Sequence, residues 1–530
     1  MALNEKIQVE MPEHCVRVPR NGRIYIQYTK RSYRNAQGKP TSERVAIGRL
    51  DEKTGKLIPN RTYYELFGEE MQQKAPEVVK KYGTYAAFYG SAKQLGLVKL
   101  LKKHFGTRAD KIMTVAQYMF SEGNVMYYME DWQEETLTVN GETLGGAALS
   151  RLFASITESE RMAFFKDWLK LKKSSEFIAY DVTSISSFGK GNTDLEWGYN
   201  RDKEKLPQIN LGMFYGEETK LPLYYRIYPG SITDKAHLRC MMEDTGLLHT
   251  KKSRYVMDRG FYSEKNLQFL TEAGCRFVIA LPEHLKYCQN LIMKHKDEII
   301  NRSACYLGPE KPYGKAFDVT ELGFRMKVHL YYDPDKAARD SAFLMEEIQK
   351  QENELSEMKE PPDKGLHYDK YFLINRAKDG SLAFLRNFSA IDDALARCGF
   401  FLIAETDFKK NSAEILDIYR RRDVIEKGFD NLKNELDMRR MYVHSEGTAQ
   451  GKAFCAFLAL IVHSHFRNVL NDYLDSHHFT FQKLLTTLDK TRRVYAPSAK
   501  SGSRFLNPPS NTVREVFDLL GFPLLLEELV

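Results

Sequence analysis

The chain has 530 residues, of which 43% are hydrophobic and 28% charged, with a formal net charge of +7 at pH 7. A single core stops growing near about 250–300 residues, so this length predicts two or three packing units. The longest apolar run, Ala453–Val462, is shorter than the roughly 20 residues of a membrane span, and the N-terminus lacks a signal-peptide core. Seven cysteines without a CxxC pair favour a reducing compartment. We therefore expect a cytoplasmic protein that does not contact a membrane.

Positive charge is concentrated near the N-terminus. Residues 16–50 contain nine Lys and Arg against one acid, and they alternate between apolar and polar types as strands do. This pattern predicts a basic β-hairpin within a β-rich region over residues 1–70. Two interpretations stay open, because such a hairpin either contacts a DNA backbone or is an edge strand kept soluble by its charge. The candidate DNA-binding residues are Arg23, Lys30, Arg31 and Arg34.

The rest of the chain divides by its hydrophobic periodicity. Apolar residues at three- and four-residue spacing predict a helical domain over 71–172, whose role in DNA binding stays open. Residues 173–282 predict three strands, a helix, a strand, a helix and a strand, which is an α/β order with a mixed sheet. A largely β segment with a charged helix from about 334 to 360 interrupts this order over 283–400. The α/β pattern returns over 401–475, and a C-terminal tail follows over 476–530.

Two of the predicted strands end in an aspartate. The runs 176–181 and 254–258 end at Asp181 and Asp258, and acids at strand ends lie where α/β sheets meet their ligands. Carboxylate oxygens suit a hard cation such as Mg²⁺, and phosphodiester cleavage is helped by two such ions about 3.5–4 Å apart. Two aspartates alone are a weak indication of catalysis, because acids at these positions also cap helices.

A long helix predicted over about 412–438 adds a third acid. At about 100° per residue, with Tyr419 at 0°, Arg422 lies near 300°, Glu426 near 340° and Lys433 near 320°. These four residues share a sector of about 60° that borders the apolar stripe of the helix. The arrangement places one carboxylate where it can reach a metal ion, with two cations and a tyrosine beside it.

The spacing Tyr419-x2-Arg422-x3-Glu426-x6-Lys433 resembles the Y-R-E-K signature of a large group of DDE transposases from bacterial insertion sequences. In that group, two aspartates precede the signature glutamate. The segment Asp181-Val182-Thr183-Ser184 resembles the setting of the first aspartate, and Asp258-Arg259-Gly260-Phe261 resembles that of the second. The gap of 168 residues (426 − 258) between the second aspartate and the glutamate is similar to the one that holds an inserted β-rich domain in the group.

The resemblance implies a ribonuclease-H-like catalytic core that cleaves DNA at transposon ends and joins the 3′ ends to target DNA. It also implies that two Mg²⁺ ions, or Mn²⁺ in their place, are bound by Asp181, Asp258 and Glu426 as catalytic residues. By the same resemblance, the phosphates of the cleaved end would be contacted by Tyr419, Arg422 and Lys433. The implied partner is double-stranded DNA, as terminal repeats and as target, at the bacterial nucleoid.

Two rival functions stay open beside an active transposase. One is a ribonuclease-H-like nuclease without strand transfer, and the other is a transposase-derived DNA-binding protein that has lost catalysis. The presence of all three acids disfavours the second rival. Because joining two transposon ends needs two catalytic centres, we expect a homodimer on DNA. The sequence has no GxxxxGK[ST] phosphate loop, so ATP is not expected as a partner.

Overall fold

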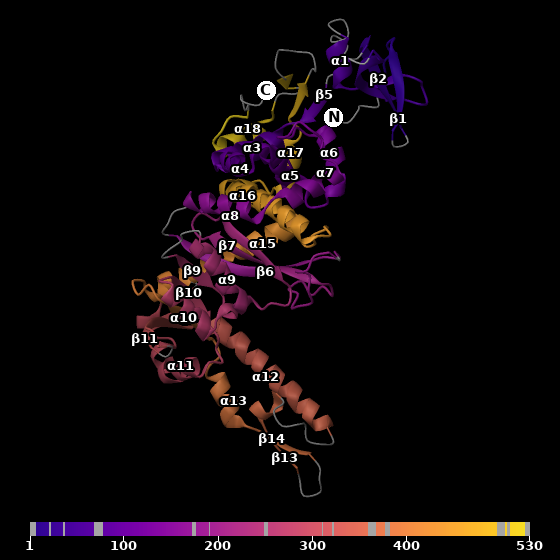
Figure 1. The fold of residues 1–530 in the computed structure, drawn as a ribbon. Coiled ribbons are helices and arrows are strands. Elements are labelled where there is room, and N and C mark those ends of the chain that lie inside the picture. The colour runs from indigo at the N-terminus through magenta and orange to yellow at the C-terminus, as the bar shows by residue number, and fades with distance from the viewer. Residues whose placement is uncertain are drawn as a thin grey trace. The chain divides into compact units, whose positions relative to one another are not determined.

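The computed structural model describes residues 7–20, 23–34, 38–67, 78–171, 176–189, 191–247, 253–309, 311–320, 323–358, 367–376, 382–495, 504–505 and 509–524. The chain forms two compact units (Figure 1). The first unit contains Met1–Trp168, Ile185–Leu195 and Asp430–Val530, and the second contains Leu169–Ser184 and Glu196–Phe429. Each unit is described by itself.

The second unit is built on an eight-stranded sheet (Figure 1). In spatial order its strands are β11 (Tyr313–Val319), β12 (Met326–Tyr332), β15 (Phe400–Glu405), β10 (Arg276–Leu281), β9 (Arg254–Met257), β6 (Phe177–Ser186), β7 (Gln208–Gly216) and β8 (Pro222–Pro229). Strands β6, β9 and β10 are parallel, whereas β15, β12 and β11 continue the sheet antiparallel, as β8 does beside β7. The prediction of a mixed α/β fold is confirmed.

Helices pack against this sheet and bury the apolar side chains of its strands. The helices of the core are α9 (Asp234–Leu247), α10 (Glu264–Glu272), α11 (Lys286–Ile299), α14 (Ser412–Arg421) and α15 (Asp423–Asp430). Helix α14 places Ile415 and Ile418 in one buried cluster with Val256 of β9 and Val278 of β10. This packing fixes the helix that carries Tyr419 relative to the strands that carry the aspartates.

The segment predicted as an insertion over 283–400 differs from the expectation of a largely β body. Its strands β11 and β12 join the main sheet, because β12 buries Met326, Val328 and Leu330 while it pairs with β15. The remainder is a helix, a hairpin and a short helix with their own apolar cluster: α12 (Pro334–Glu357), β13 (Phe372–Arg376), β14 (Leu382–Arg386) and α13 (Phe388–Leu395). The predicted end of the charged helix, at about residue 360, lies outside the described residues.

The helix predicted over 412–438 is not continuous in the structure. Helix α14 ends at Arg421, Arg422 is its C-cap, and α15 begins at Asp423. A π-helical turn follows over Asn431–Glu435, in which the Leu436 N–H donates to the Asn431 carbonyl at 3.0 Å. A π turn bonds i→i+5 instead of i→i+4, so the angular register calculated for an α-helix does not extend to Lys433.

The first unit begins with a four-stranded sheet of β1 (Cys15–Arg20), β2 (Arg23–Arg34), β3 (Pro40–Leu50) and β4 (Leu57–Pro59). The predicted basic hairpin is confirmed as β2 and β3, although its turn falls largely on residues 35–37, outside the described residues. Helices follow as predicted: α3 (Gly83–Gln94), α4 (Leu97–Phe105), α5 (Ala109–Glu122), α6 (Met129–Glu135), α7 (Gly146–Ser155) and α8 (Glu158–Lys170). Short elements complete the unit: α1 (Arg61–Leu66), and a small sheet of β5 (Val78–Lys81), β16 (Arg492–Tyr495) and β17 (Arg504–Phe505).

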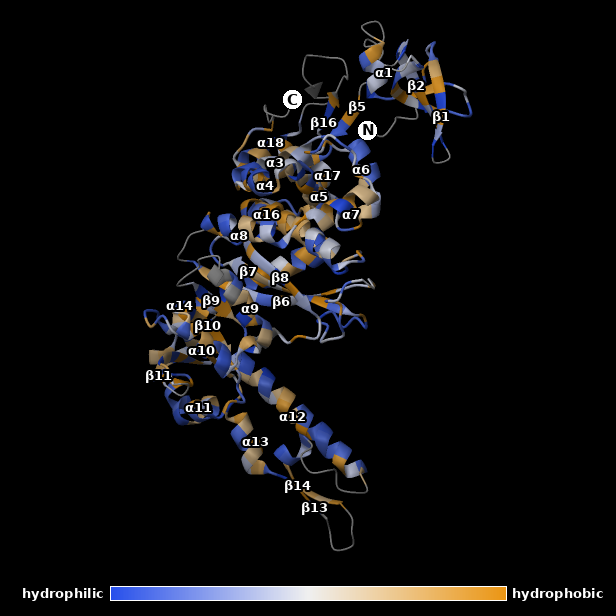
Figure 2. Ribbon diagram, viewed as in Figure 1, coloured by the Kyte–Doolittle hydropathy of each residue, from blue (hydrophilic) through white to orange (hydrophobic). Residues whose placement is uncertain are grey.

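The core of the first unit is the C-terminal helix α16 (Glu446–Ser476), joined by α17 (Phe481–Leu488) and α18 (Asn511–Leu520). We expected residues 401–475 to complete the sheet unit, but α16 packs on α5 and α7 of the first unit. Its Phe454 ring contacts Phe105 and Phe164 at centroid distances of 5.1 and 5.2 Å. Every residue from Gly451 to Ser464 is buried, and Figure 2 colours much of α16 as hydrophobic. Helix α16 is long and apolar enough to cross a membrane by length and composition, and 78% of its most apolar window is buried inside the protein.

Candidate active site

The two predicted aspartates lie side by side at one position of the sheet. The parallel ladder between β6 and β9 ends at the pair Tyr180 and Met257, and the next residue on each strand is Asp181 or Asp258. We predicted that this strand ends at Asp181. Strand β6 instead continues beyond the end of β9 to Ser186. The two carboxylates therefore start from adjacent strands at equal height.

Helix α14 brings the signature tyrosine to the second aspartate. The Tyr419 hydroxyl donates a hydrogen bond to Asp258 Oδ1 at 3.0 Å. Burial, with the neighbouring Asp258 carboxylate, raises the pKa of Tyr419 far above its usual value, so the phenol stays protonated as a donor. Tyr419 therefore fixes the orientation of Asp258.

Arg422 lies between the other two acids. Its Nη2 donates to Glu426 Oε1 at 2.6 Å, and its Nη1 is 3.7 Å from Asp181 Oδ2. The guanidinium also stands 5.6 Å from the centroid of the Tyr419 ring. The structure thus gathers Asp181, Asp258, Glu426 and the signature tyrosine around one arginine.

Asp181 and Glu426 differ in exposure. The side chain of Glu426 is 51% exposed, that of Asp181 is 21% exposed, and that of Arg422 only 14%. Burial raises the pKa of Asp181 to about 6; the Val182 N–H, at 2.8 Å from Oδ1, and the charges of Arg422 and Arg201 oppose this rise, and the charge of Asp258 adds to it. Burial therefore favours the protonated form of Asp181 more strongly than the two arginines and the Val182 N–H favour the charged form.

The donor set fits a divalent cation in its chemistry. Three carboxylates supply only oxygen ligands, and two of them repel each other, which a hard cation would relieve. Within the described part of the chain, no three His, Cys, Asp or Glu side chains are grouped closely enough to ligate one ion. Arg422 pairs with Asp181 and Glu426 at the place where an ion would have to bind both.

One hydrogen-bonding group at the centre of this arrangement has no partner. Arg422 Nε is buried and lacks an acceptor within the described residues. A buried donor without an acceptor costs about 1–3 kcal/mol. The site therefore offers a donor to an acceptor that the described residues do not provide.

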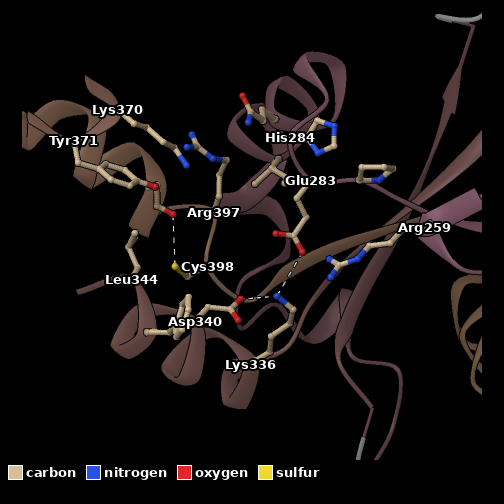
Figure 3. A pocket seen from close by; sticks show the side chains of 16 residues that line it. Arg259, Glu283, His284, Lys336, Asp340, Leu344, Lys370, Tyr371, Arg397 and Cys398 are labelled. Carbon is tan, nitrogen blue, oxygen red and sulfur yellow. Dashed lines mark hydrogen bonds and ion pairs between the residues drawn. The ribbon is translucent and has the colours of Figure 1, made fainter. Parts of the chain in front are cut away.

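A cavity of about 790 Å³ opens beside the site (Figure 3). Arg259, the residue after Asp258, lines it together with Arg397 and Lys370, and the one further cation, Lys336, pairs with the two acids of the lining, Glu283 and Asp340. The Lys336 amine lies 3.6 Å from Glu283 and 2.5 Å from Asp340, as the dashed lines in Figure 3 show. The cavity therefore keeps an excess of positive charge next to the aspartates.

The remaining predicted DNA-binding residues lie in the first unit. Lys433, in the π turn, is only 8% exposed. On strand β2, Arg31 pairs with Glu43 at 3.0 Å and stands 5.2 Å from the Tyr33 ring centroid, whereas Arg34 Nη1 donates to a turn carbonyl at 2.9 Å. Arg23 and Lys30 are exposed. These residues belong to the first unit, whereas the three acids belong to the second.

Arg201 is a site residue that we did not predict. Its Nη1 lies 3.5 Å from Ser184 Oγ on β6, and its charge lowers the pKa of Asp181. Neither spacing nor periodicity places the segment Gly198–Asp202 beside Asp181. Only the tertiary fold brings this loop to the site.

The family profile described as Transposase DDE domain matches residues 172–462 of this chain. The chain belongs to this family. The match contains β6 and α15, which carry Asp181 and Glu426, and it contains Asp258 directly after β9.

Among solved structures, the cryo-EM structure of the piggyBac transposase synaptic complex with hairpin DNA is similar to this chain at 10% sequence identity and a TM-score of 0.33. The similarity covers 64% of this chain and 56% of that chain. No curated protein matches the sequence.

Proposed function

We propose that this chain is the DNA transposase of a bacterial insertion sequence, of the group with the Y-R-E-K signature. It binds double-stranded transposon ends in the cytoplasm at the nucleoid, cleaves them by metal-assisted hydrolysis and joins the 3′ ends to target DNA as a homodimer. Asp181, Asp258 and Glu426 would hold two Mg²⁺ ions, or Mn²⁺ in their place. When bound, these ions generate the attacking hydroxide and stabilise the leaving oxygen.

The observation that carries the proposal is the position of Arg422 among the three acids. A permanent cation cannot ligate a metal, but it is a good ligand for phosphate oxygens. Its buried Nε lacks an acceptor in the described residues. A DNA phosphate supplies such an acceptor, and it would let Glu426 exchange the arginine for a metal ion.

The other residues have supporting roles. The Tyr419 hydroxyl holds Asp258, so that the carboxylate presents its second oxygen to an ion. The cations that line the cavity of Figure 3 suit a DNA backbone that continues past Arg259. We include Lys433 and the exposed basic residues of β2 as further phosphate contacts.

The proposal is tested on linear DNA fragments that contain the sequences flanking the gene, by gel shift and by cleavage with Mg²⁺. Asp181→Asn and Glu426→Gln should lower cleavage by about 10³-fold, because a lost metal ligand removes several kcal/mol of transition-state stabilisation. DNA affinity should change by no more than about threefold, since most phosphate contacts stay.

Asp423→Asn provides the matched control. Asp423 lies on the same helix as Glu426 and pairs with Lys427 at 2.7 Å on the helix surface, so its loss should leave cleavage unchanged. Calorimetric titration with Mn²⁺ measures metal binding independently of activity, and Asp181→Asn should weaken the binding of Mn²⁺. Cleavage at the wild-type rate by either site variant would refute the assignment, and cleavage without joining to a target plasmid would indicate a nuclease.

A further inference from the structure

The loop between β6 and β7 presents two large aromatic rings to solvent. Trp197 is 68% exposed and Tyr199 is 84% exposed. Neither ring contacts another ring or a cation within the described residues. Exposed rings of this size on one short loop call for a partner, because a protein gains nothing by leaving them in water.

The loop that carries them is firmly anchored. Glu196 and Gln208 exchange two backbone hydrogen bonds at 3.1 and 3.0 Å, which closes the base of the loop. The Tyr199 carbonyl accepts from Gln208 Nε2 at 3.0 Å, and the Asn200 carboxamide accepts from two N–H groups of the following turn. The exposure of the rings is therefore a property of an ordered loop.

Gly198, between the two aromatic residues, is packed against the backbone of another segment. A Cβ on Gly198 would lie 1.9 Å from the Gly230 carbonyl oxygen, so this side of the loop is packed against backbone. In an extended segment, residues i and i+2 lie on the same side and are about 6.6 Å apart. Trp197 and Tyr199 flank this packed glycine, and both of their rings are exposed.

This spacing suits nucleobases. Bases along a DNA strand repeat about every 3.4 Å, so two intervals take about 6.8 Å. Two aromatic rings at about this separation can hold one base between them or stack on successive bases. The neighbouring Arg201 lies 3.5 Å from Ser184 Oγ and its charge lowers the pKa of Asp181, which connects the loop to the candidate active site.

We propose that Trp197 and Tyr199 form a stacking platform for unpaired bases of a DNA strand that passes the Asp181 edge of the sheet. This inference rests on the proposed action of the chain on DNA. It assigns to this loop the recognition of bases as flat rings, without sequence preference, while the cations hold phosphates.

The tryptophans of the chain make the platform directly observable. The other two, Trp132 and Trp168, are buried, so a change in fluorescence on DNA binding reports Trp197. The probe is an oligothymidylate of about 12 nucleotides, compared with an abasic strand of equal length that has the same phosphates and no bases. The full-length protein is titrated in EDTA, so that the readout is independent of cleavage.

We expect oligothymidylate to quench the fluorescence and to bind more tightly than the abasic strand. Trp197→Ala and Tyr199→Ala should each weaken oligothymidylate binding by about 5- to 150-fold, since stacking contributes about 1–3 kcal/mol per base. Their affinity for the abasic strand and the dependence of log Kd on log salt should not change, because no phosphate contact is lost. Trp197→Phe, which keeps a ring, should retain most of the affinity. Tyr306→Ala, at an exposed tyrosine of the same unit, is the control and should bind as the wild type does.

Equal binding of the two strands, without quenching, would overturn the platform. The proposed function would then still stand if the wild type cleaves DNA in Mg²⁺. Conversely, base-dependent quenching by a protein that never cleaves DNA would support the platform and refute the transposase. The two proposals can therefore fail separately.

Discussion

Lys452 offers the sharpest test of how the first unit is held together. This lysine is fully buried in α16, where its Nζ donates to the carbonyls of Asn124 at 3.0 Å and Met441 at 2.9 Å. Asn124 in turn donates from Nδ2 to the Asp437 carbonyl at 3.0 Å. The amine thus connects α16 to the segment after α5, which contains Asn124, and to the segment that contains Met441. We predict that Lys452→Met changes how the stability of this unit depends on pH.

The magnitude follows from the pKa of the amine. Burial lowers the pKa of Lys452 from 10.5 to about 7, against the opposing charge of Asp437. Because the folded pKa is lower than the unfolded one, the unfolded chain binds more protons between pH 7 and 10.5, and stability rises with pH in this window. Each pH unit contributes about 1.4 kcal/mol, so the whole window of 3.5 units (10.5 − 7) amounts to on the order of 5 kcal/mol.

Lys452→Met removes this titration and leaves two carbonyls without their donor, at about 1–3 kcal/mol each. Below pH 7 the two effects nearly cancel, because the variant also avoids burying a charged amine. From pH 7 to 9 the wild type should gain about 2–3 kcal/mol over the variant. When the free energies of unfolding of the two proteins are subtracted at each pH, the contributions of all titratable groups that they share cancel.

The assay uses urea unfolding followed by tryptophan fluorescence in a Trp197→Phe background. The remaining tryptophans, Trp132 and Trp168, both lie in the first unit, so the signal reports this unit alone. The exposed Lys102 on α4 supplies the control, and Lys102→Met should show the same pH profile as its background. Parallel profiles for Lys452→Met and its background would refute the reasoning, because they would mean that the amine titrates normally.

Three further predictions concern other parts of the structure. Arg397→Ala, in the cavity of Figure 3, should weaken DNA binding and reduce the slope of log Kd against log salt by about 1; equal slopes would exclude a phosphate contact. Gly451→Ala should destabilise the first unit by about 1–3 kcal/mol in thermal unfolding, since the added Cβ would lie 2.1 Å from the Phe153 carbonyl oxygen, and an unchanged midpoint would contradict this packing. Burial raises the pKa of Glu217 from 4.5 to about 7, despite its pairing with Arg421, so the folded state binds the extra proton and wild-type stability should fall as pH rises through 7. Glu217→Gln should lack this decline when thermal unfolding is compared at low and neutral pH.

Much of the fold is predictable from local patterns, because each strand and helix records its own buried face. The runs that end near Asp181 and Asp258 are the central parallel strands, and the apolar stripe of α14 does pack on them. Local patterns do not say which neighbour buries a face. Strands β11 and β12 lie in the segment predicted as an insertion but pair with the main sheet, and α16 follows the three acids of the site in sequence but packs with the N-terminal helices.

The site shows the same division between local and tertiary information. The two strand positions and the helix position of the acids follow from periodicity. The break of the helix at Arg422 and the π turn before Leu436 do not, because an angular calculation assumes one uninterrupted helix. The pairing of Arg422 with two acids and the approach of Arg201 depend on contacts between segments far apart in the chain.

The position of Arg422 predicts that the binding of metal and the binding of DNA are linked. While the guanidinium pairs with Asp181 and Glu426, it competes with any cation for the same oxygens. A phosphate that engages Arg422 frees these oxygens, so DNA should raise the affinity for Mn²⁺, and Mn²⁺ should raise the affinity for DNA by the same factor, as linkage requires. A coupling of about 1–3 kcal/mol corresponds to about a 5- to 150-fold change in affinity. Calorimetric Mn²⁺ titrations with and without bound DNA measure this factor. Arg422→Met should tighten Mn²⁺ binding in the absence of DNA and abolish the coupling, whereas Mn²⁺ affinities that do not respond to DNA in the wild type would show that Arg422 does not connect the two ligands.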